Sequence, residues 1–222
     1  MFPEIQGKID SYDIIVIGHQ RANVYFGDDP KKPPRGKPVT CTSTLVQGRC
    51  EDGSPYALLI DPTTRSTPED FYFELRRRSG LLPEDITHCF STHEHFDHIE
   101  GLTYFPQAAW MVEARNRPWV GASMLVDKAK LVPVQGEFLP GVYAVPLPGH
   151  TYTACGIAFA YEGRKYLAAG DAVVSRHHFK ELANNFEDDP AAARATQQMI
   201  LKTYDVVIPG HDNLFLIQVP RG

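Results

Sequence analysis

The sequence predicts an α/β protein arranged as a four-layer αββα sandwich, in which two mixed sheets pack face to face and helices cover their outer faces. Short apolar runs typical of buried strands predominate in both halves of the chain, and each half has its own surface helix. The 222 residues and a hydrophobic fraction of 43% provide enough chain for a substantial core. We therefore expect residues 1–222 to form one domain.

The first half of the chain contains strand patterns and one helix. The expected strands are apolar runs at 13–18, 40–47, 56–61 and 86–92. A turn at Gly53 predicts that the second and third runs form a hairpin. The helix is expected to begin after Thr67, with Pro68 and two acids in its first turn, and to end near Gly80.

A polar loop at 27–38 separates the first two predicted strands. It carries Lys31, Lys32, Arg35 and Lys37 among four prolines, which restrict its backbone. One interpretation is a solvated loop. The other is a flap that covers a site and meets an anionic substrate.

The second half alternates strands with surface segments. The expected strands are at 108–113, 131–135, 141–147, 154–171 (a hairpin across Glu162-Gly163), 205–212 and 214–219, the last covering a sheet edge. Residues 116–119 are expected to form a turn or short helix. An amphipathic helix is expected at 188–203, with Pro190 near its first turn.

The segment 91–101, STHEHFDHIEG, places His93, His95, Asp97 and His98 within six residues. These side chains would cost free energy if they were crowded together without a partner, so a bound cation is the natural explanation. Because side chains alternate along a strand, all four can converge only if the strand ends here and the chain turns. Asp97 with Glu100 also resembles a capping box, which is the structural alternative for Asp97.

Three further candidate ligands follow apolar runs in the same way as His93 follows ITHCFST. VYAVPLPG precedes His150, KYLAAG precedes Asp171 and DVVIPG precedes His211. Strands that carry ligands at their carboxyl ends bring them to one rim of a sheet. Gly149 lets the backbone bend so that His150 can leave the sheet. The pattern predicts one composite metal site.

The ordered motifs HxHxDH, PGHT, GD and PGH, within residues 58–218, resemble the metallo-β-lactamase superfamily. The resemblance implies the fold of that superfamily and a pair of metal ions. It assigns His93, His95 and His150 to one ion, Asp97, His98 and His211 to the second, and Asp171 to a bridge between them.

Asp61 follows the apolar run ALLI, where the superfamily usually carries an aspartate that orients a metal-bound histidine. The alternative for Asp61 is a turn aspartate before Pro62.

The resemblance also implies a binuclear metallohydrolase. A hydroxide that bridges two divalent ions would cleave an ester, lactone, thioester or phosphodiester, and Asp97 would be the catalytic residue that orients it and moves its proton. Imidazole and carboxylate ligands favour zinc, with iron or manganese as alternatives.

Two groups within the superfamily are similar to residues 170–212, which contain GDAVVSRHHF, DDPAAARA and IPGHD. They are metallo-β-lactamase domain-containing protein 1, linked with RNA cleavage, and the N-acyl homoserine lactonases, linked with lactone opening. The expected partner is a small-molecule substrate, with RNA as the alternative. Substrate-binding candidates, which are equally explained as ordinary rim or surface residues, are Arg176, His178 and Tyr152.

Two other classes remain as alternatives. PGHTYTAC and GDAVV also resemble persulfide dioxygenases, which hold one iron through the residues that match His93, His150 and Asp171. A binding protein that keeps its metal without turnover is the third class, although no site residue is missing.

Composition favours a cytoplasmic protein. The sequence has no apolar run of about 20 residues and no signal-peptide pattern, so we expect no membrane partner. The four cysteines lack CxxC spacing and are expected to be reduced thiols. A net charge of −5 gives no overall attraction to nucleic acid.

Overall fold

The computed structural model describes residues 5, 9–19, 39–63, 67–181 and 187–217. The basic loop predicted at 27–38 therefore lies outside the described residues, as does the end of the last predicted strand. None of the helices in these ranges is both long enough and apolar enough to cross a bilayer.

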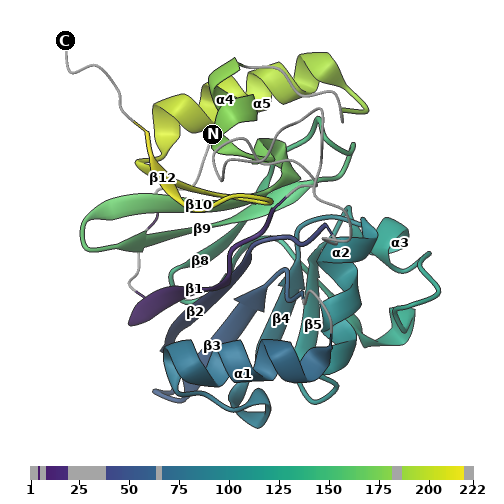
Figure 1. Cartoon of the computed structure of the whole chain (residues 1–222), viewed down its shortest axis with the longest axis vertical. Helices are drawn as coiled ribbons and strands as arrows, with labels where there is room; N and C mark the ends of the chain where they lie inside the picture. The colour runs from purple at the N-terminus through teal and green to yellow at the C-terminus, as the bar shows by residue number, and fades with distance from the viewer. Residues whose placement is uncertain (1–4, 6–8, 20–38, 64–66, 182–186, 218–222) are drawn as a thin grey trace.

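The first sheet contains six strands in chain order (Figure 1). They are β1 (Ser11–Val16), β2 (Ser43–Arg49), β3 (Pro55–Ile60), β4 (His88–Ser91), β5 (Ala109–Glu113) and β6 (Leu131–Val134). β1, β2 and β3 are antiparallel, which confirms the hairpin predicted at Gly53, and β3 to β6 are parallel. Parallel strands end at the same edge, so β3 and β4 present their carboxyl ends side by side.

The second sheet also has six strands, in the order β12-β11-β10-β9-β8-β7. They are β7 (Gly136–Leu139), β8 (Val142–Pro146), β9 (Cys155–Tyr161), β10 (Arg164–Gly170), β11 (Val206–Pro209) and β12 (Phe215–Leu216). The predicted hairpin is β9 and β10, and its turn residues Glu162 and Gly163 both have positive φ, 48° and 74°. Within this second sheet the one parallel pair among the described strands is β10 and β11. β12 covers the edge of β11, as expected. β7 was not expected, because its four residues, GEFL, are too few to give a clear strand pattern.

Helices cover the outer face of each sheet. α1 (Pro68–Ser79) lies on the first sheet, and α4 (Arg176–Glu181) and α5 (Pro190–Thr203) lie on the second (Figure 1). Shorter helices are α2 (Phe96–Ile99), α3 (Arg117–Val120), and the 3-10 turns η2 (Pro83–Asp85), η3 (Glu100–Tyr104), η4 (Lys128–Lys130) and η5 (Asp171–Val173).

Alternation along the strands divides the core into layers. On β3, Leu58 and Ile60 belong to the cluster between the two sheets, whereas the adjacent Leu59 packs with Phe71 and Leu75 of α1. A third cluster joins the second sheet to α4 and α5. The predicted αββα arrangement of two mixed sheets is confirmed.

The start and end of α1 follow the sequence signals. Thr67 has an extended backbone, and its N–H donates to Asp70 Oδ2 at 3.3 Å. Gly80 ends the helix with φ of 77°, and its N–H donates to the carbonyl of Arg76 at 2.9 Å. This helix and the edge strand β1 are neighbours in the fold.

Candidate metal centre

Four strand ends deliver the predicted ligands to one place. β4 ends two residues before His93, β8 ends four residues before His150, β10 ends directly before Asp171, and β11 ends two residues before His211. These strands belong to both sheets, so the candidate ligands meet where the rims of the two sheets face each other.

The motif after β4 supplies its ligands through a change from strand to helix. β4 ends at Ser91, and α2 begins at Phe96 with His95 at its N-cap position. The chain therefore turns within the motif, as the alternation of side chains requires. Asp97 is the second residue of α2 and not its N-cap, so the capping-box alternative for Asp97 is wrong.

The seven predicted ligands form two groups. Within each group the ligand atoms lie within 4.8 Å of one another. The first group is His93, His95, His150 and Asp171, and the second is Asp97, His98 and His211. The six ligands other than Asp171 fall into the two sets that the family resemblance implies, and Asp171 lies in the first group; their roles as metal ligands stay a prediction.

The two oxygens of Asp171 face different groups. Oδ2 lies 3.5 Å from His150 Nε2 in the first group. Oδ1 lies 3.3 Å from His98 Nε2 and 3.3 Å from His211 Nε2 in the second. A carboxylate in this position can contact two cations at once, which is the geometry of a bridging ligand.

Several buried atoms of the site have no hydrogen bond among the described residues. They are His93 Nε2, His98 Nε2 and Asp171 Oδ1. An unpaired buried polar atom costs about 1 to 3 kcal/mol, so these three atoms in two adjoining ligand groups need partners. Imidazole nitrogen and carboxylate oxygen are ligands of zinc and of other divalent transition metals. The residues present therefore fit a metal centre.

Asp61 contacts one of the candidate ligands, His98. Its Oδ2 lies 2.9 Å from His98 Nδ1, which directs Nε2 of that imidazole into the second group. Its carboxylate also accepts from the Thr92 N–H and hydroxyl, both at 2.8 Å. Asp61 has φ of 48°, an unfavourable value for a residue other than glycine.

The strained backbone of Asp61 is held from β2 and the segment before it. The carbonyl of Asp61 accepts from the Ser43 hydroxyl and from the Cys41 thiol. Cys41 Sγ lies closer to the carbonyl oxygen of Asp97, at 2.9 Å, so its single proton is shared between the two carbonyls. Burial raises the pKa of Cys41 to about 12, so the thiol stays protonated and acts as a donor.

His211 is oriented by a backbone group. Its Nδ1 lies 3.0 Å from the carbonyl of Thr40, so Nδ1 carries the proton and Nε2 faces the second group. Gly210 makes this approach possible, because a Cβ there would lie 2.0 Å from Asp171 Oδ1. The glycine of the PGH motif is thus needed for close packing against the bridging carboxylate.

The pKa values of the imidazoles in the site are shifted in opposite directions. Burial lowers the pKa of His93 well below its ordinary value, and the neighbouring His98 lowers it further. Burial would also lower the pKa values of His98 and His211, but nearby carboxylates outweigh it and raise both. Burial raises the pKa of Asp171, whereas His211 and His98 together hold it well below the usual range.

The three predicted substrate-binding residues have different surroundings. Tyr152 is 64% exposed, directly after the buried Thr151. Arg176 donates from Nη2 to the carbonyl of Leu214 at 3.2 Å and lies over the Phe215 ring. His178 Nδ1 lies 2.8 Å from the Ser175 hydroxyl. The contacts of Arg176 and His178 serve local structure, and substrate binding by these three residues stays a prediction.

Sequence reasoning missed four orienting residues, Thr40, Cys41, Ser43 and Thr92. Three of them lie in the run TCTS at 40–43, for which the sequence pattern predicts only a strand. The signal that could have found them is a stretch of small polar side chains in an otherwise apolar strand, because buried hydroxyl and thiol groups must have hydrogen-bond partners. Thr92 stood within the ligand motif itself.

Comparison with known proteins gives consistent matches. The family model described as "Metallo-beta-lactamase superfamily" matches residues 36–211. Metallo-beta-lactamase domain-containing protein 1 of Rattus norvegicus is 30% identical over 201 residues, which cover 83% of this chain and 75% of the relative. An N-acyl homoserine lactonase of a Bacillus species is 25% identical over 171 residues, covering 71% of this chain and 67% of the relative.

Solved structures have a similar fold over most of this chain. The crystal structure of a quorum-quenching N-acyl homoserine lactone lactonase superposes with a TM-score of 0.67 at 19% identity, covering 93% of this chain and 94% of that chain. At this identity the similarity shows a common fold.

Proposed function

This chain belongs to the metallo-β-lactamase superfamily of hydrolases, and we propose that it is a binuclear metallohydrolase that opens a lactone or a related small ester. The observation that carries the proposal is the position of Asp171, whose two oxygens face two groups of metal-type ligands. With Asp171 shared, each group has the three or more protein ligands that a catalytic zinc site uses.

The chain's own residues have distinct roles in this proposal. His93, His95 and His150 would hold one ion, His98 and His211 with Asp97 the other, and Asp171 both. Two such ions lower the pKa of a shared water toward about 7 and polarise the oxygen of the bond to be cleaved.

In this proposal Asp97 would accept and pass on the proton of that water. Its Oδ2 lies 3.5 Å from His211 Nε2 and 3.9 Å from His98 Nε2, and its side chain is 22% exposed. A carboxylate that touches the ligand group and also reaches solvent can accept a proton and pass it on.

Exposed aromatic side chains support a small substrate with an apolar part. Phe96 is 61% exposed between His95 and Asp97, and Tyr152 is 64% exposed after His150. Their segments adjoin, because His95 Nδ1 lies 3.0 Å from His150 Nε2 and the Thr151 hydroxyl donates to Glu94 Oε2 at 3.2 Å. Apolar surface beside a polar centre is typical of small-molecule sites. The similarity to lactonases points the same way.

The alternative functions fit less well. A persulfide dioxygenase with one iron would need only His93, His150 and Asp171, yet the second group is complete and oriented by Asp61 and Thr40. RNA cleavage would use the same centre, so it is tested beside lactone opening.

The free thiols of Cys41, Cys50, Cys89 and Cys155 support the predicted cytoplasmic location.

The test begins with protein purified without chelator or added metal. Elemental analysis should give two zinc ions, or two mixed divalent ions, per chain. The same protein is then assayed with N-acyl homoserine lactones, with a thioester and with a single-stranded RNA. Turnover of a lactone that is lost in Asp97→Asn but kept in Glu94→Gln supports the proposal, because Glu94 is the matched carboxylate of the same motif.

Other outcomes would reject it. One iron per chain with oxygen consumption on persulfides would establish the dioxygenase alternative. RNA cleavage without lactone turnover would show that the substrate is RNA and not a lactone or small ester. Two ions without turnover of any of these substrates would leave a metal-binding protein and end the proposed activity.

A further inference from the structure

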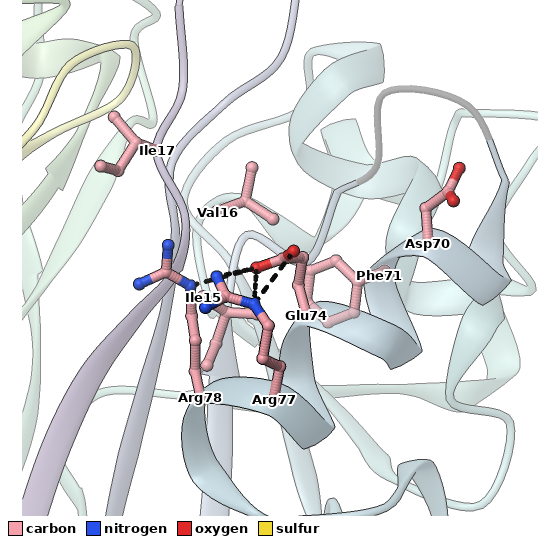
Figure 2. A pocket seen from close by; sticks show the side chains of 8 residues that line it. All are labelled: Ile15, Val16, Ile17, Asp70, Phe71, Glu74, Arg77 and Arg78. Atoms are coloured by element: carbon pink, nitrogen blue, oxygen red, sulfur yellow. Dashed lines mark hydrogen bonds and ion pairs between the residues drawn. The ribbon is translucent and has the colours of Figure 1, made fainter.

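A cavity of about 360 Å³ lies between the edge strand β1 and helix α1, and none of its lining residues is a candidate metal ligand (Figure 2). Its lining includes two guanidinium groups, on Arg77 and Arg78, and two carboxylates, on Asp70 and Glu74. Because these charges balance, the cavity does not favour a ligand of either charge. Its apolar wall offers little surface, since Phe71 is 1% exposed. The contacts that the proposed function leaves unexplained lie instead around Thr92.

The hydroxyl of Thr92 contacts a histidine of each ligand group. The residue directly precedes His93 and is 0% exposed. Its Oγ1 lies 2.8 Å from Asp61 Oδ2, 3.1 Å from His93 Nδ1 and 3.4 Å from His98 Nδ1. His98 Nδ1 is closer to Asp61 Oδ2, at 2.9 Å, so its partner is the carboxylate. The hydroxyl is therefore left to serve His93.

The position of one proton decides how Thr92 and His93 interact. A hydroxyl has a single proton, and that of Thr92 is donated to Asp61 Oδ2. Towards His93 the hydroxyl therefore presents a lone pair, so Nδ1 of His93 is the donor in the 3.1 Å contact. In a neutral imidazole one nitrogen carries the proton and the other has the lone pair. The lone pair of His93 is thus on Nε2.

Nε2 is the atom of His93 that a cation would need. It is buried and has no hydrogen bond among the described residues. An acceptor at Nδ1 fixes both the tautomer and the ring orientation of a metal-binding histidine. In the second group His98 has the Asp61 carboxylate for this purpose, whereas in the first group His93 has the hydroxyl of Thr92.

The hydroxyl of Thr92 is held in place from both sheets. The Thr92 N–H donates to Asp61 Oδ1 at 2.8 Å, and Asp61 follows β3 of the first sheet. The Thr92 carbonyl accepts from the N–H and the thiol of Cys155, at 3.0 Å and 2.9 Å, and Cys155 begins β9 of the second sheet. Gly170 packs closely on the hydroxyl, because a Cβ there would lie 2.4 Å from Oγ1. The hydroxyl therefore has little room to turn away from His93.

We propose that Thr92 is a positioning residue of the first ligand group, whose hydroxyl holds His93 with Nε2 presented to the ion. This inference rests on the proposed metal centre and deepens it, because the family resemblance supplies an orienting residue for the second group alone. The role needs the hydroxyl and not the methyl group. Serine can therefore replace threonine here, whereas valine, which keeps the shape and lacks the hydroxyl, cannot.

The experiment compares wild type, Thr92→Val and Thr92→Ser. Thr203→Val is the matched control, because the Thr203 hydroxyl donates to the carbonyl of Met199 within α5, at 2.9 Å. Competition with a coloured chelator measures the two zinc affinities, and circular dichroism verifies folding. In zinc-loaded protein with isotope-labelled histidine, NMR shows which ring nitrogen of His93 carries the proton, and His93→Gln assigns the signal.

We expect the affinity for one of the two zinc ions to fall about 10- to 100-fold in Thr92→Val and to be largely restored in Thr92→Ser. The affinity for the other ion should be unchanged, and Thr203→Val should match the wild type at both. The His93 proton should be on Nδ1, and its signal should move upfield in Thr92→Val, where the acceptor is missing.

Three results would overturn the role of the hydroxyl while leaving the proposed hydrolase intact. They are equal zinc affinities in wild type and Thr92→Val, equal losses in Thr92→Val and Thr92→Ser, and a proton on Nε2 of His93 in the wild type. If Thr92→Val does not fold, the NMR spectrum of the wild type and the zinc affinities of Thr92→Ser decide. A wild type that binds no zinc would overturn the proposed function itself and this inference with it.

Discussion

The two ligand groups of the metal centre differ in how the protein supports them. In the second group the imidazoles of His98 and His211 are buried, and each donates through Nδ1, to Asp61 and to the carbonyl of Thr40 respectively. In the first group His95 is exposed, and His93 Nδ1 has the Thr92 hydroxyl, at 3.1 Å, as its neighbour. Of these four histidines, His98 and His211 are the two whose Nδ1 lies against a carboxylate or carbonyl oxygen.

The protonation state of the imidazoles also differs between the two groups. Carboxylates raise the pKa values of His98 and His211, so these imidazoles hold protons that a metal must displace. Burial lowers the pKa of His93, which therefore offers a free lone pair near neutral pH. The comparison teaches that His93 offers a free lone pair to an ion, whereas His98 and His211 are firmly oriented but compete with protons. The predictions below separate the two groups.

Asp171→Ala should have the largest effect, because it removes the residue that both groups share. We expect loss of bound metal from both groups and a fall in turnover of at least about a hundredfold. Metal analysis and steady-state kinetics measure the two effects. The exposed turn variant Asp52→Ala is the control, and retention of two ions by Asp171→Ala would contradict the bridging assignment.

Asp97→Ala should affect the second group alone. We expect one ion to remain per chain and turnover to fall below about a tenth of wild type, because a ligand and a proton carrier are lost together. The far-ultraviolet dichroism spectrum should be unchanged, since Asp97 is partly exposed. Activity above that level would show that Asp97 is neither ligand nor proton carrier.

Asp61→Asn tests the orientation of His98 rather than its presence. Loss of an orienting partner typically weakens metal affinity by about 10- to 100-fold, and we expect this loss for the second ion with the first unaffected. Competition with a coloured chelator measures both affinities, and Asp52→Asn is the matched control. Equal weakening at both sites would mean that Asp61 supports the fold of the whole rim.

The pH dependence of stabilisation by zinc should differ between the two groups, and this is the smallest of the expected effects. In the metal-free protein the raised pKa values of His98 and His211 stabilise the fold below the unfolded pKa of about 6.5, and this contribution is lost as pH rises through the folded values. The gain in Tm on adding zinc should therefore increase between about pH 6 and pH 8, as fewer protons must be displaced.

The same titration on Asp97→Ala sharpens the result. Zinc that binds only the first group meets the neutral His93, so its effect on Tm should vary less with pH. Asp171 contributes no slope in this window because its pKa is held well below the usual range. A pH dependence equal to that of the wild type would show that the two groups do not differ in proton competition.

The sequence by itself determined the fold class and the elements that deliver the site. The apolar run ALLI, the turn signal at Gly53 and the caps of α1 are local properties, and each led to the observed element. The candidate ligands were predictable for the same reason, because every one follows an apolar run or lies within six residues of the next. Local patterns failed at β7, where the short segment GEFL pairs with β8 because of its position in the sheet.

Only the tertiary structure decided what surrounds the ligands. Cys41 contacts the carbonyl of Asp97 across 56 residues of sequence, and Thr40 contacts His211 across 171. The cavity between β1 and α1 likewise joins residues 15–17 to 70–78. A ligand motif is readable because one short segment carries its chemistry. Orientation, proton affinity and cavities depend on groups that are brought together by packing of the two sheets, and no local pattern records those distances.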